Sequence, residues 1–66
     1  MNITLNGEPR WVDPSKTLAG LVETLGLDLR KVAVERNLEI VPRSIYAQTL
    51  LAEGDRIEIV HFIGGG

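Results

Sequence analysis

Hydrophobic and polar positions alternate at the start of the chain, and the alternation predicts a β-hairpin. Ile3 and Leu5 are separated and flanked by polar residues, which is the two-residue period of a half-buried strand. Asn6-Gly7 follows, and both residue types accept the positive φ that a tight hairpin turn needs. We therefore predict a returning strand over residues 10–12, with Val12 pointing inward and Trp11 outward.

The next apolar positions change to a helical period. Thr17 is a residue type that caps helix N-termini, and the apolar residues after it recur at i, i+3, i+4 and i+7. Gly26 follows at the position typical of a helix C-cap glycine. The pattern predicts one short amphipathic helix, whose apolar stripe consists of Leu18, Leu21, Val22 and Leu25.

The second half of the chain alternates short apolar runs with turn residues. We predict a strand over residues 32–36, a short strand at residues 40–41, and a final strand over residues 56–62. Residues 44–51 predict a helical turn and a loop that pack four apolar side chains, namely Ile45, Tyr46, Leu50 and Leu51. Three acidic residues are interpreted as turn residues, namely Asp13, Glu53 and Asp55.

This order of elements predicts an α+β fold. One helix must cover one face of a mixed sheet of four to five strands to bury its stripe. The last strand is apolar enough for a central position, and pairing with the first strand would make these two strands parallel. We expect one domain over residues 1–63 and a flexible glycine tail over residues 64–66.

Composition excludes several classes of function. The chain has 66 residues and no cysteine, so disulfides and thiolate metal sites are excluded. The net charge is −2, with basic and acidic residues interspersed, which argues against a nucleic-acid partner. No apolar run approaches the roughly 20 residues that span a bilayer. We expect a cytoplasmic protein that does not enter the membrane.

No catalytic group is predicted, because His61 is the only histidine and has no evident nucleophile to pair with. No acidic cluster has the spacing of a metal site. The chain ends in Gly64-Gly65-Gly66, and an α-carboxylate with a pKa of roughly 3.3–3.7 is ionised at pH 7. Glycine fits channels too narrow for other residues. We interpret Gly66 as the group that another enzyme modifies, although a terminus without function has the same pattern.

The final strand also predicts a docking surface. If Ile57 and Ile59 face the helix, alternation turns Val60 and Phe62 to the opposite face. Apolar side chains exposed there, close to the tail, would contact a partner. With Ile63, they form the predicted docking residues.

Taken together, several features resemble the bacterial sulfur-carrier family of thiamine biosynthesis, which has the ubiquitin-like β-grasp fold. They are the element order, Asn37, Ile40-Val41-Pro42-Arg43, Gly54-Asp55 before an apolar strand, and the diglycine end. The resemblance covers essentially the whole chain. Gly64 is a departure, because the family pattern needs only the last two glycines.

The resemblance implies a protein cosubstrate and not an enzyme. An adenylating enzyme of the ubiquitin-activating type would use ATP and Mg²⁺, which this chain does not bind, to convert Gly66 to an acyl-adenylate. A sulfur donor of the cysteine desulfurase type would then yield a thiocarboxylate, and a thiazole synthase would take the sulfur. In this scheme Gly64 and Gly65 enter the partner's active site.

Three alternatives share parts of this pattern. A sulfur carrier for molybdopterin or cysteine biosynthesis would have the same fold and tail. A ubiquitin-like modifier would join Gly66 to lysines of other proteins. A plain binding module would have a glycine tail without a role.

Overall fold

The computed structural model describes residues 1–62 and has a five-stranded sheet with the strand order β2-β1-β5-β3-β4. The strands β1 and β5 are parallel, and the other neighbours are antiparallel. The predicted α+β class, the element order and the central, parallel position of the last strand are confirmed. The strands are β1 (Asn2–Leu5), β2 (Glu8–Trp11), β3 (Val32–Arg36), β4 (Glu39–Val41) and β5 (Arg56–His61).

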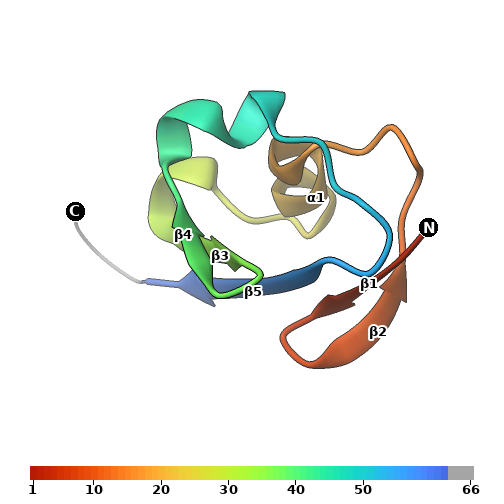
Figure 1. Cartoon of the computed structure of the whole chain (residues 1–66). Helices are drawn as coiled ribbons and strands as arrows, with labels where there is room; N and C mark the ends of the chain where they lie inside the picture. Colours follow the sequence, from red (N-terminus) through yellow and green to blue (C-terminus); the bar gives the residue numbers. More distant parts are fainter. Residues whose placement is uncertain (63–66) are drawn as a thin grey trace.

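The helical segments lie on one side of this sheet (Figure 1). They are the helix α1 (Leu18–Thr24) and the 3₁₀ segments η1 (Leu29–Lys31) and η2 (Arg43–Gln48). No helix in residues 1–62 is long and apolar enough to cross a membrane. The arrangement of one helix across a mixed sheet is the expected β-grasp fold.

The first hairpin forms as its turn residues predict. Asn6 and Gly7 have φ values of 50° and 84°, the left-handed values that a two-residue hairpin turn uses. The returning strand begins earlier than predicted, at Glu8, because the tight turn pairs Glu8 directly with Leu5. Val12 is buried and Trp11 is exposed, so the predicted orientation of both side chains is confirmed.

The helix begins and ends where its caps place it. The Thr17 hydroxyl accepts a hydrogen bond from the backbone N–H of Gly20 at 3.0 Å. Gly26 has a φ of 75°, a conformation that favours glycine after a helix. The predicted stripe faces the sheet, with Leu25 partly buried and three residues fully buried: Leu18, Leu21 and Val22.

The core lies between this stripe and the inner face of the sheet. Ile57 and Ile59 of β5 are buried there, as predicted, together with Ile3 of β1 and two valines of β3. β5 is the central strand, and it pairs with β1 at Arg56 and Ile57 and with β3 from Ile57 to His61. The strand that leads to the C-terminal glycines is therefore held by the middle of the sheet.

The prediction for residues 44–51 was partly wrong. Tyr46 and Leu51 are buried, but Ile45 and Leu50 are exposed. In a 3₁₀ segment with three residues per turn, neighbouring side chains point about 120° apart, so Tyr46 faces the core and Ile45 does not. Leu50 forms an isolated β-bridge with Thr17, so the backbone there is extended. Successive side chains of an extended chain point to opposite sides, so Leu50 is exposed where Leu51 is buried.

Candidate functional site

The face of the sheet opposite α1 exposes apolar side chains, and no helix in residues 1–62 covers it (Figure 1). We call it the open face. Ile40 of β4 is 79% exposed and Val60 of β5 is 63% exposed, both far more than a core residue. Trp11, on the edge strand β2, is exposed on the same face, because it pairs with Asn2 while Ile3 points into the core.

The predicted outward orientation of Val60 is confirmed. Val60 points away from the core, and Phe62, just after β5, is 37% exposed. The backbone N–H of Phe62 donates to the carbonyl of Lys31, the residue before β3, at 3.0 Å. The backbone is therefore hydrogen-bonded to the rest of the fold as far as Phe62. That these side chains dock a partner stays a prediction. Ile63 and the predicted tail residues Gly64, Gly65 and Gly66 lie outside the described residues.

Two carboxylates lie between the exposed apolar side chains of the open face. Glu35 of β3 is directly opposite Glu58 of β5, and Ile40 is opposite Glu35 on its other side. In the next pair on this face, two residues along β3, Ala33 is opposite Val60. Cross-strand partners share a face of the sheet, so Ile40, Ala33 and Val60 adjoin an acidic pair.

Asp55 has a structural role that the sequence interpretation missed. It was interpreted as a turn residue, but its side chain is buried, and the residue is only 5% exposed. Its carboxylate accepts hydrogen bonds from Arg36 Nε at 3.0 Å, Asn37 Nδ2 at 3.1 Å and the backbone N–H of Ala52 at 2.8 Å. The side-chain Oδ1 of Asn37 accepts in turn from the backbone N–H of Arg56 at 2.8 Å. This network fastens the β3–β4 turn to the start of β5.

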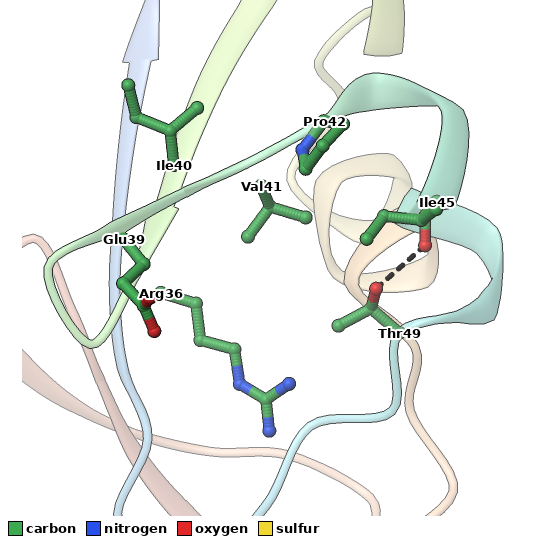
Figure 2. A pocket seen from close by; sticks show the side chains of 7 residues that line it. All are labelled: Arg36, Glu39, Ile40, Val41, Pro42, Ile45 and Thr49. Carbon is green, nitrogen blue, oxygen red and sulfur yellow. Dashed lines mark hydrogen bonds between the residues drawn. The ribbon is translucent and has the colours of Figure 1, made fainter.

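A hollow at the rim of the fold lies between β4 and η2 (Figure 2). Its volume of about 240 Å³ is below the roughly 300–1,000 Å³ of small-molecule sites. Nε of Arg36 is bonded to Asp55, and the Thr49 hydroxyl donates to the carbonyl of Ile45 at 2.7 Å. Two of its polar groups therefore serve the fold. The lining residues are Arg36, Glu39, Ile40, Val41, Pro42, Ile45 and Thr49.

The described residues show no catalytic or metal-binding arrangement. Within residues 1–62, no three His, Cys, Asp or Glu side chains are grouped as metal ligands would be. His61 is exposed at the end of β5, opposite Val32. The open face, with its exposed apolar side chains, is the candidate site.

Comparison with known proteins identifies the family of this fold. The model of the ThiS family matches residues 3–66. The chain belongs to the ThiS family. The sulfur carrier protein ThiS of Bacillus subtilis is 40% identical over 65 residues, which cover 97% of this chain and 98% of that protein. The crystal structure of the thiamine biosynthesis protein ThiS from Geobacter metallireducens matches with a TM-score of 0.83 and 36% identity, over 100% of both chains.

ThiS-family sequence also occurs within longer proteins. A thiazole synthase of Paramagnetospirillum magneticum is 58% identical over all 66 residues of this chain. The chain spans about 20% of the length of that protein. The predicted resemblance to the sulfur-carrier family of thiamine biosynthesis is therefore confirmed.

Proposed function

We propose that this ThiS-family chain carries sulfur for thiamine biosynthesis on its last residue, Gly66. The observation that carries the proposal is the match to a sulfur carrier protein along nearly the full length of both chains. The related thiazole synthases support thiazole synthase as the protein that receives the sulfur, and they favour the thiamine pathway over molybdopterin or cysteine biosynthesis. The carrier works beside its enzymes in the cytoplasm.

In the proposed reaction, this chain is a cosubstrate and its partners catalyse. An oxygen of the Gly66 carboxylate attacks the α-phosphate of ATP on the adenylating enzyme, and pyrophosphate leaves. The outer sulfur of a persulfide on a donor protein of the cysteine desulfurase type then attacks the acyl carbon, and AMP leaves. A thiol reductant cleaves the S–S bond of the resulting acyl disulfide and releases the thiocarboxylate. ATP and Mg²⁺ belong to the adenylating enzyme, so this chain needs no cofactor of its own.

The fold supports the proposal by where it brings the chain out. β5 lies between β1 and β3, it pairs with β3 as far as His61, and the backbone is still hydrogen-bonded at Phe62. Four residues beyond it span at most about 14 Å when fully extended, at roughly 3.3–3.6 Å per residue. Docking through the open face would therefore fix the position of Phe62 on the partner. The four residues after Phe62 are long enough to enter a buried active site.

The docking role assigned to Val60 and Phe62 follows from their exposure beside this exit. Burying an aliphatic or aromatic side chain contributes roughly 1.5–3 kcal/mol when it was fully exposed before. Val60→Asp should therefore weaken binding to the adenylating enzyme and thiazole synthase. Its effect on the free energy of unfolding should be small, because Val60 already faces solvent.

Intact mass spectrometry tests the chemistry. The chain is incubated with its cognate adenylating enzyme, MgATP and a sulfur donor, and the expected product has one oxygen replaced by sulfur at Gly66. Gly66→Ala should slow this conversion without changing the free energy of unfolding, and removal of Gly65-Gly66 should abolish it. Covalent adducts with many proteins would instead identify a modifier. If the variant without Gly65-Gly66 kept full function, the chain would be a plain binding module whose glycine tail has no role.

The proposal requires a free α-carboxylate on Gly66 in the working protein. Because related sequence lies within longer thiazole synthases, this requirement deserves its own measurement. The intact mass of the protein purified from its natural source reports whether Gly66 is the last residue. A polypeptide that continues past Gly66 and is never cleaved there would contradict the proposal.

A further inference from the structure

A small hollow on the open face combines apolar walls with two carboxylates. Its volume is about 130 Å³. The short side chain of Ala33 leaves space between Val60, its cross-strand partner, and Ile40 on the neighbouring strand. The residues that line it are Ala33, Val34, Glu35, Ile40, Glu58 and Val60.

The two carboxylates of this hollow are in an unfavourable arrangement for the free protein. Directly opposed side chains have Cβ atoms roughly 4.5–5.5 Å apart, and like charges at such positions destabilise a sheet. Arg56 offsets this in part, because its Nε lies 3.3 Å from Glu58 Oε1. Within residues 1–62, Glu35 forms no ion pair. The two negative charges of Glu35 and Glu58 are therefore offset by the single positive charge of Arg56.

A partner that covers Ile40 and Val60 must also remove water from these carboxylates. Burying an unpaired carboxylate is strongly unfavourable, so a wholly apolar partner surface would bind poorly here. A lysine or arginine side chain fits both properties of the hollow, since its alkyl stem packs on apolar surface while its charged head bonds to carboxylates. Two copies of this chain joined through the open face would instead bring four carboxylates together.

We infer that the hollow receives one lysine or arginine side chain of the thiazole synthase. The stem packs on Ala33, Ile40 and Val60, and the cationic head bonds to Glu35 and Glu58. This inference rests on the proposed function, because it assumes docking through the open face. It adds a charged contact that discriminates between partners, whereas apolar contacts alone would accept many surfaces.

Titration calorimetry with the cognate thiazole synthase tests the inference. Glu35→Gln and Glu58→Gln keep the side-chain shape and remove the charge, and each should raise Kd by about tenfold. The double variant should also lose much of the salt dependence of binding. Glu39→Gln is the matched control, because Glu39 adjoins Ile40 but points to the other face, and its Kd should not change.

Stability measurements separate a binding role from a structural one. Glu35→Gln removes a repulsion, so the free energy of unfolding of the free protein should stay equal or rise while binding weakens. A Kd unchanged in both single variants, with binding lost in Val60→Asp, would overturn the cation contact and keep the docking face. Unchanged binding in Val60→Asp would overturn the docking face itself. Dimerisation that Val60→Asp abolishes, measured by sedimentation equilibrium, would assign the face to a second copy.

Discussion

Replacing Asp55 by alanine should destabilise the fold strongly, because its buried carboxylate joins the end of β3 and the β3–β4 turn to the loop before β5. It accepts hydrogen bonds from Arg36 on β3, from Asn37 in the β3–β4 turn and from Ala52 before β5. Alanine would remove all three bonds. It would also leave the Arg36 guanidinium, whose side chain is 30% exposed, without its carboxylate partner.

The size of the loss follows from these contacts. Each hydrogen bond contributes about 1 kcal/mol net, and somewhat more when a charged group takes part. Breaking a fully buried ion pair costs about 3–5 kcal/mol, but Arg36 reaches solvent, so the lower end applies. We expect a loss of about 3 kcal/mol. A chain of 66 residues has a total free energy of unfolding of roughly 3–10 kcal/mol, so the substitution would remove about a third of it or more.

Urea denaturation followed by far-ultraviolet circular dichroism measures this loss, and the slope m checks that unfolding remains two-state. At about 4–8 °C per kcal/mol, Tm should fall by roughly 12–24 °C. Asp55→Asn should lie between wild type and Asp55→Ala, because an amide NH₂ would face another donor. Asp13→Ala is the control, since Asp13 is exposed. A loss below about 1 kcal/mol in Asp55→Ala, with unchanged m, would refute the network argument.

Two further predictions concern the turns. Leu38 has a φ of 71° after Asn37 at 53°, so Leu38→Gly should raise the free energy of unfolding by about 0.5–1 kcal/mol in urea denaturation. Leu50→Gly, at an exposed leucine without positive φ, should lower it, and a loss in both variants would contradict the reasoning. Hydrogen bonds from the side chain and backbone of Arg30 lower the pKa of Asp28 from 3.8 to about 2. The stabilisation that Asp28 contributes is therefore complete above about pH 4 and is lost as pH falls through 2. The stability difference between wild type and Asp28→Asn should shrink over that range of pH, and a constant difference would contradict the assignment.

The elements that sequence patterns predicted correctly depend on local chemistry. Asn6-Gly7 forms the turn that its residue types allow, and Thr17 caps the helix that follows it. The alternation along β5 placed Val60 outside and Ile59 inside because one face of that strand is buried. Each of these features is decided within a few residues of the chain, where pattern and structure share the same period.

The features that the patterns missed depend on distant pairing. Asp55 is buried because Arg36 and Asn37, almost 20 residues earlier, supply donors to it. The acidic pair of the open face exists because β3 and β5 are neighbours in one particular register. The sequence did contain a signal for the pairing of β3 with β4, since a two-residue turn after Arg36 places Ile40 opposite Glu35. Which strand lies on the other side of β3 could not be read from local patterns.

The parallel pairing of β1 with β5 sends the two ends of the domain in opposite directions. Thr4 is level with Arg56, so Met1 lies three positions before this point and His61 five positions after it. At roughly 3.3 Å per residue, the amino end and the exit of β5 are about 26 Å apart along the sheet. A sensor surface, dye or purification handle attached ahead of Met1 would therefore leave the outgoing end of the chain free to meet an enzyme.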